Sequence, residues 1–126
     1  MNPVPVFMYH HVSPHKGDMV TVAPDVFEAQ MRFLAEAGYK TLRADELVEL
    51  AGGNLVIKEK AVAITFDDGY IDNYVYAFPV LKKYNIKATI FLVTDWVERS
   101  SEFGVRSLEL KTKKLPNHNE CKRFIN

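Results

Sequence analysis

Four short runs of mainly hydrophobic residues divide the first part of the chain. They cover residues 4–12, 39–42, 61–66 and 88–93. The run at 61–66 is almost continuously apolar, which is typical of a parallel strand that is covered on both faces. Each run is therefore predicted to form a buried β-strand, with the strand at 61–66 in the centre of the sheet.

The segment after the first run has the spacing of an amphipathic helix. It begins near Pro24, and proline is favoured in the first turn of a helix. Phe27, Met31 and Leu34 then fall on one face, and Gly38 ends the pattern. We expect this face to pack on the sheet.

Two further helices are predicted between the later strands. One begins at about residue 45 and ends at Gly52 and Gly53, and its inward residues are expected to be Leu47, Leu50 and Ala51. The other runs from about 71 to 84, and Pro79 is expected to bend or divide it.

The repeated order of strand and helix predicts an α/β fold with a parallel sheet. The pattern alone does not distinguish an open sheet from a closed barrel. Beyond about residue 99 the periodicity fades, so residues 99–126 are predicted to be a loop or weakly helical tail, with one short helix at 118–125.

Composition excludes several classes of protein. The 126 residues suit one domain or part of one, and 16 basic residues balance 16 acidic ones, so no nucleic-acid partner is expected. The single cysteine leaves no internal disulfide or zinc knuckle. No signal peptide or membrane span is visible, which predicts a cytoplasmic chain as written.

The strongest chemical signal is the pair Asp67 and Asp68, which directly follows the central hydrophobic run. Ligands collect at the carboxyl ends of parallel strands. Adjacent carboxylates repel unless a cation, a shared proton or hydrogen bonds stabilise them, so the pair indicates a metal site or an acid/base site. Gly69 allows the backbone to turn closely beneath it. The alternative is that one aspartate only caps the next helix.

The sequence Thr65-Phe66-Asp67-Asp68-Gly69, together with the strand at 87–93, resembles the polysaccharide deacetylase family (the NodB homology domain, carbohydrate esterase family 4). Residues 8–12 and 27–47 resemble a subgroup that includes poly-N-acetylglucosamine deacetylases. The resemblance covers about residues 3–98.

For the fold, this resemblance implies a partial, distorted β/α barrel that holds the first four strand–helix units. Residues 1–98 would be the N-terminal part of a deacetylase domain, and 99–126 an incomplete continuation of it. Such a partial barrel leaves an open strand edge and an uncovered apolar face, which predicts self-association.

For function, the resemblance implies a hydrolase that removes N-acetyl groups from an amino-sugar polysaccharide or oligosaccharide. It makes Asp67 the catalytic base and Asp68 a ligand of a divalent metal, usually zinc in this family. Members of the family are often exported. The family's later metal-binding histidines do not follow residue 93. The alternative is therefore a catalytically inactive module for binding or assembly; an aspartate-based magnesium phosphohydrolase would need a different acidic spacing.

Histidines and aromatic residues near the first strand and the aspartate pair complete the expected site. His10 and Tyr70 are expected to face the glycan, because His10 leaves a strand end and Tyr70 directly follows the aspartates. His11 and His15 are expected to lie in a solvated loop. Most other aromatic residues are expected in the core, including Tyr9, Phe66, Phe91 and Trp96.

Overall fold

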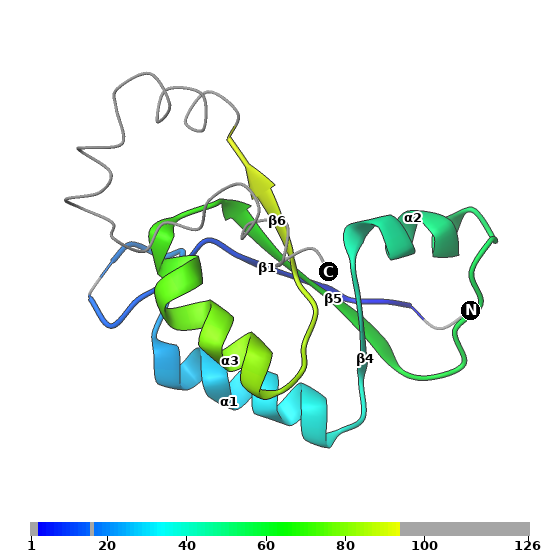
Figure 1. Ribbon diagram of the computed structural model, residues 1–126, viewed down its shortest axis with the longest axis horizontal. Helices are drawn as coiled ribbons and strands as arrows, with labels where there is room; N and C mark the ends of the chain where they lie inside the picture. Colours follow the sequence, from blue (N-terminus) through cyan, green and yellow to red (C-terminus); the bar gives the residue numbers. More distant parts are fainter. Residues whose placement is uncertain (1–2, 16, 94–126) are drawn as a thin grey trace.

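A parallel β-sheet organises the described part of the chain. The computed structural model describes residues 3–15 and 17–93. Its main sheet has four strands (Figure 1): β1 (Val6–Tyr9), β4 (Lys40–Leu42), β5 (Ala61–Asp68) and β6 (Thr89–Leu92). The predicted α/β architecture with a parallel sheet is confirmed.

The strand β5 lies at the centre of this sheet and pairs with the other three strands. Along one edge it pairs with β1, with Val6 beside Ala63. Along the other edge it pairs first with β4 and then with β6, so that Thr65 lies beside Thr89. The sheet therefore forks along this edge, because β4 and β6 share different halves of β5.

Two threonine hydroxyls bridge the fork between β4 and β6. The backbone N–H of Lys87 donates to Thr41 Oγ1 at 3.0 Å. The N–H of Ala44 donates to Thr89 Oγ1, also at 3.0 Å. Side-chain acceptors thus satisfy backbone donors that a continuous sheet would pair with carbonyl groups.

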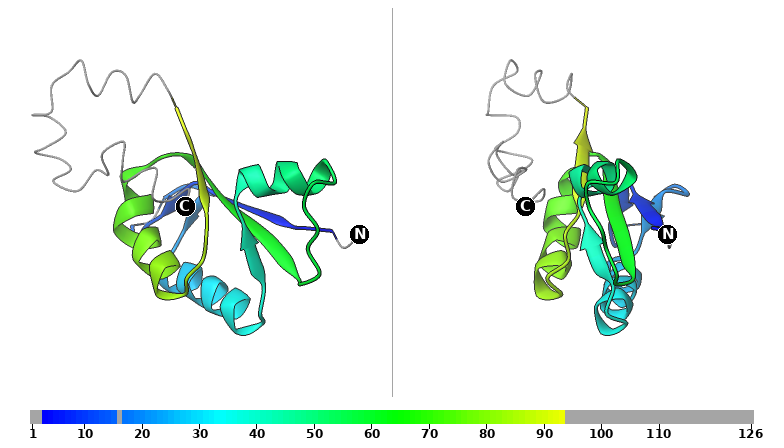
Figure 2. Two further views of the ribbon diagram at one scale, coloured as in Figure 1. Left: turned by 45° about the vertical axis from the view of Figure 1, so that its right-hand side comes forward. Right: turned by 90° about the vertical axis from the view of Figure 1, so that its right-hand side faces the viewer.

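Two of the three described α-helices lie next to each other, and the third lies apart from them. The pair consists of α1 (Pro24–Glu36) and α3 (Phe78–Lys83), which lie next to each other, while α2 (Ala44–Ala51) stands apart from them beside β4 (Figures 1 and 2). The helix α2 ends at Gly52, as predicted. Ala51 is exposed, so its predicted inward position is wrong, whereas Leu47 and Leu50 are half-buried.

The core lies between the sheet and the α1–α3 pair. Phe27, Met31 and Leu34 of α1 are buried, which confirms the predicted helix face. Tyr9 and Phe66 come from neighbouring positions of β1 and β5. The rings of Tyr9 and Phe27 meet edge to face at 5.1 Å, and those of Tyr9 and Phe66 stack at 5.5 Å. These aromatic contacts fix α1 against the strands.

The opposite face of the sheet is less covered. Alternation along β5 places Thr65 and Asp67 on this face. Their neighbours in the register include Met8 on β1 and Phe91 on β6, which are 62% and 52% exposed. Phe91 was expected in the core, and its exposure corrects that expectation, because no described element covers this side of β6. Among the described residues this face exposes apolar side chains, whereas the uncovered face of a partial barrel and self-association stay predictions.

The first predicted strand is broken in two. Residues 4–12 were expected to form one strand, but β1 ends at Tyr9 and His10 lies in a bend. The next strand, β2 (His11–Val12), pairs in parallel with β3 (Thr21–Val22) in a separate two-stranded sheet. The pairing with β3 redirects the chain away from β5.

The predicted helix at 71–84 is also divided, as Pro79 suggested. The π-helix η1 (Asn73–Ala77) leads into α3, which carries Pro79 in its first turn. Because proline has no N–H to donate, it is tolerated in a first turn and not inside a helix.

Some expectations concern residues outside the described part of the chain. These are the tail at 99–126, its short helix at 118–125, and Trp96. Within residues 3–15 and 17–93, no helix has the length and apolar character needed to cross a bilayer.

We expect Phe27→Ala to lower the free energy of unfolding by about 3–5 kcal/mol, because it opens a cavity in the core. Phe33→Ala is the matched control on the same helix, since Phe33 is 63% exposed and its loss should change stability by only about 0.5 kcal/mol. Urea unfolding followed by circular dichroism measures both. Equal losses from the two variants would contradict this description of the core.

The stability should fall as pH rises from 10 to 12. Burial raises the pKa of the Tyr9 phenol to about 12. The unfolded chain releases this proton at its ordinary pKa of about 10 while the folded chain retains it, so rising pH favours unfolding. Tyr9→Phe also removes a hydrogen bond to Gln30 Oε1, so the slopes against pH must be compared, not the absolute stabilities. A Tyr9→Phe slope equal to that of the wild type would refute the assignment.

Candidate active site

Asp67 and Asp68 are the last two residues of β5, and both are half-buried. They were expected immediately after the strand, but the strand continues through them because β6 still pairs with it there. The carboxyl ends of β1, β5 and β6 lie at the same rim of the parallel sheet. The structure thus places both carboxylates where α/β proteins carry their chemistry.

A tight turn follows the two aspartates. Asp68 has φ of 76° and Gly69 has φ of 70°, so two successive residues adopt the left-handed conformation. Aspartate tolerates this region better than most residues, and glycine enters it without a steric penalty. A Cβ on Gly69 would also lie 2.4 Å from Leu92 Cδ2. The backbone conformation therefore favours glycine at position 69, and a larger residue would also have to displace the end of the Leu92 side chain.

The bend after β1 brings His10 to Asp67. The parallel register that pairs Tyr9 with Phe66 places the next residues, His10 and Asp67, side by side. His10 Nε2 lies 3.6 Å from Asp67 Oδ2, with the two side chains 24% and 30% exposed. This distance is too long for a good hydrogen bond, but it lies within the range of an ion pair when the imidazole is protonated.

A second cluster lies next to this pair. The rings of His11 and Tyr70 stack at 3.7 Å between centroids, and His11 Nδ1 lies 2.6 Å from Asp72 Oδ2. His11 is therefore not in a solvated loop, as expected from the sequence, because β2 and the ion pair hold it. Desolvation raises the pKa of the Tyr70 phenol, and the neighbouring Asp68 carboxylate raises it further.

Asp72 and Asn73 connect the two clusters. Asn73 Nδ2 donates to the carbonyl oxygen of His10 at 2.8 Å and to Asp72 Oδ1 at 3.1 Å. The N–H of Val12 donates to the same Asp72 oxygen at 3.3 Å. The sequence analysis did not identify these two residues as part of the site, since nothing in a local pattern links positions about 60 residues apart.

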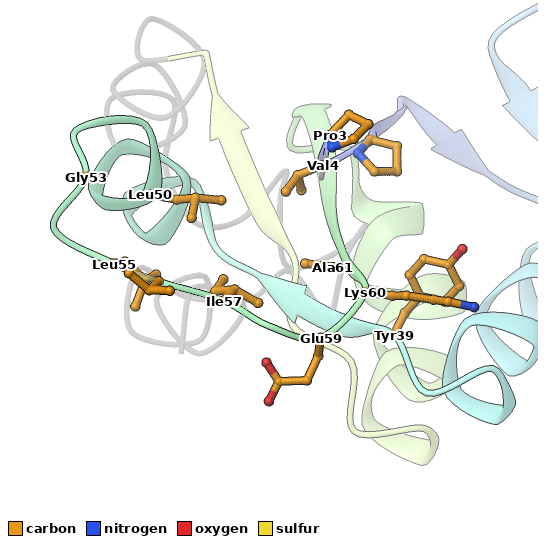
Figure 3. Close-up of a pocket in the computed structure, with 12 residues that line it drawn as sticks. Pro3, Val4, Tyr39, Leu50, Gly53, Leu55, Ile57, Glu59, Lys60 and Ala61 are labelled. Atoms are coloured by element: carbon orange, nitrogen blue, oxygen red, sulfur yellow. The ribbon is translucent and has the colours of Figure 1, made fainter. Parts of the chain in front are cut away.

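A pocket of about 770 Å³ opens at the other end of β5 (Figure 3). Leu50 of α2 and Ala61 at the start of β5 lie on its wall, with residues of the chain between these two elements. Its lining is mostly apolar, and it belongs to the amino end of the strand. The aspartates at the carboxyl end are thus separate from this pocket.

Comparison with known proteins identifies the family. Residues 56–119 match the sequence model of the polysaccharide deacetylases. The chain belongs to the polysaccharide deacetylase family. A Bacillus subtilis protein assigned to the polysaccharide deacetylases, YxkH, is 47% identical to this chain over 90 residues, which cover 71% of the chain and 32% of that protein.

Two further relatives agree with this assignment. The poly-β-1,6-N-acetyl-D-glucosamine N-deacetylase of Escherichia coli is 30% identical over 100 residues, which cover 78% of this chain and 15% of that enzyme. The structure of the Streptococcus pyogenes deacetylase PplD, solved in complex with acetate, superposes with a TM-score of 0.72 at 34% identity and covers 78% of this chain and 46% of that one. The chain thus spans less than half the length of each of these relatives.

The described residues do not complete a metal site. Among residues 3–15 and 17–93, no group of three or more histidine, cysteine, aspartate or glutamate side chains could hold a metal ion. A zinc site needs three protein ligands. The predicted role of Asp68 as a ligand therefore stays a prediction. His15, which was expected in a solvated loop, is exposed.

Gly69→Ala should destabilise the protein more than Gly38→Ala. Both glycines have positive φ, of 70° and 74°, so each substitution adds about 1–2 kcal/mol of backbone strain. Only at position 69 does the new methyl group collide with Leu92, whereas nothing lies within 4 Å at position 38. Adding Leu92→Ala should relieve the excess cost of Gly69→Ala. Equal losses of unfolding free energy in the two single variants would disprove the close contact.

Proposed function

We propose that this chain carries the first part of the catalytic centre of a metal-dependent hydrolase that removes N-acetyl groups from an amino-sugar polysaccharide or oligosaccharide. The observation that supports it most is the pair Asp67 and Asp68 at the carboxyl end of β5, with His10 Nε2 3.6 Å from Asp67. The relatives named as N-deacetylases of poly-N-acetylglucosamine support the same reaction.

The two aspartates would have different roles in the reaction. Asp67 would act as the base that takes a proton from the attacking water, and Asp68 would be a ligand of a divalent metal, with zinc as the expected ion. A bound metal would acidify that water and polarise the acetyl carbonyl. Hydrolysis then yields acetate and the free amine. The other ligands would come from outside the described residues.

His10 and Tyr70 are the proposed contacts to the glycan. His10 lies at the rim beside Asp67, where the acetyl group must approach the base. The Tyr70 ring stacks with the His11 ring at the same rim. Desolvation raises the pKa of the Tyr70 phenol, and the neighbouring Asp68 carboxylate raises it further, so the phenol would lie beside the proposed metal ligand.

We infer that the sheet is part of a distorted β/α barrel, with residues 1–98 forming the N-terminal part of the deacetylase domain and 99–126 its incomplete continuation. Helices cover the face that carries Phe66, as they would on the outside of a barrel. The opposite face presents Met8 and Phe91, which a closed barrel would bury in its interior.

The alternative is a catalytically inactive module for binding or assembly. It is favoured by the lack of a three-ligand group among the described residues and by the exposed apolar side chains of β1 and β6. Self-association through the open edge of β1 would belong to this function.

Zinc affinity and acetate release together separate the two functions. Under the first proposal, the protein that contains this chain together with the remaining ligands releases acetate from a chitooligosaccharide, Asp67→Asn lowers the rate by about 10²–10⁴-fold, and zinc affinity measured by calorimetry is unchanged. Asp68→Asn should instead weaken zinc binding. Asp45→Asn, at an exposed position of α2, is the control and should change neither.

The outcomes have distinct meanings. A rate that is insensitive to Asp67→Asn would rule out Asp67 as the base. Zinc binding without any acetate release would favour the inactive module. Weak zinc binding that is unchanged by Asp68→Asn would show that Asp68 is not a ligand of the metal.

A further inference from the structure

The bend that carries His10 is held by side chains instead of by the main sheet. It lies between the end of β1 at Tyr9 and the start of β2 at His11. Three successive residues of this bend are bound by Asp72 and Asn73: the carbonyl of His10, the ring of His11 and the N–H of Val12. The side chains of two neighbouring residues, Asp72 and Asn73, thus hold residues 10–12 in place.

Asn73 is the buried part of this arrangement. It is only 1% exposed, and its Nδ2 donates to both His10 and Asp72. Its Oδ1 has no hydrogen-bond partner among the described residues, although a buried, unsatisfied acceptor costs about 1–3 kcal/mol. The same residue begins the π-helix η1, a conformation that is often found at functional sites.

Asp72 supplies the carboxylate that holds the bend at residues 10–12. Its Oδ2 lies 2.6 Å from His11 Nδ1, and its Oδ1 accepts from Val12 and Asn73. Hydrogen bonds to a carboxylate are shorter and stronger than those between neutral groups. Because Asp72 follows Asp67 by only five positions, it fixes the bend to the same turn that leaves β5.

We propose that Asp72 and Asn73 are positioning residues, which fix the bend at 10–12 and thereby hold the imidazole of His10 against Asp67. This inference rests on the proposed role of Asp67 as the base. Without these two residues, the hydrogen bonds left to the bend within the described part of the chain are backbone bonds to the β3 side, from His11 to Val20 and from Ser13 to Val22. His11 would keep its stacking on Tyr70, but none of these contacts involves His10 itself, so the distance between His10 and Asp67 would be less tightly fixed.

The test measures the coupling between His10 and Asp67 by nuclear magnetic resonance on the metal-free full chain. Asp67→Asn should shift the ring signals of His10 in the wild-type background. In an Asn73→Leu background, which has a side chain of similar size without the amide, the same substitution should shift them by less than half as much. Asp45→Asn, at an exposed position, replaces Asn73→Leu as the control background and should preserve the full shift.

Circular dichroism establishes that each variant is folded. If Asn73→Leu does not fold, Asp72→Asn provides the same comparison, because it weakens the contact to His11 and keeps the side-chain shape. A general loss of stability would not selectively remove the response of His10 to Asp67. An undiminished response in both backgrounds, or no response in the wild type, would overturn the proposal.

This result is independent of the catalytic test. Loss of the coupling in Asn73→Leu, with no acetate release by the protein that contains this chain and the remaining ligands, would retain the positioning role and refute the proposed activity. Acetate release by that protein with an unchanged coupling would support the activity and exclude positioning by Asn73.

Discussion

The burial of β5 is the constraint on which the rest of the structure depends. Its first six residues are buried, and its two edges are occupied by β1 on one side and by β4 and β6 on the other. Helices α1 and α3 pack on the face that carries Phe66. A strand held in this way has little freedom to shift its register, so the aspartates at its end are held in a fixed position. The buried apolar residues of β5 therefore determine where the two carboxylates lie at the rim of the sheet.

The sequence predicts what depends on local periodicity. The four main strands, the buried face of α1 with Phe27 and Met31, and the division of the helix near Pro79 all follow from spacing and from the chemistry of proline. The prominence of Asp67 and Asp68 also follows from local sequence, because a continuous apolar run that ends in two carboxylates is unusual. These features need no knowledge of distant contacts.

The other features of the fold and of the candidate site depend on contacts between residues far apart in the sequence, which the periodicity of the sequence does not indicate. The break at His10 arises because the chain leaves β5 to pair with β3, a strand of only two residues. The contact between His11 and Asp72 joins positions 61 apart, and a single histidine has the same appearance in a solvated loop as in a buried pair. The fork of the sheet could not be predicted from the sequence either. Threonine is a common residue in strands, so nothing in the sequence indicates that the hydroxyls of Thr41 and Thr89 accept backbone hydrogen bonds across the fork.

The short path from the sheet to the pair of His11 and Asp72 has an entropic consequence. Joining residues 61 apart would by itself impose a large loss of chain entropy. Tyr9 and Phe66 already lie side by side in the sheet, however, so most of that loss occurs when β1 meets β5. His11 and Asp72 then close only the short segments that extend beyond these two residues. A few polar contacts suffice to order the rim, because the hydrophobic strands have already brought its two sides together.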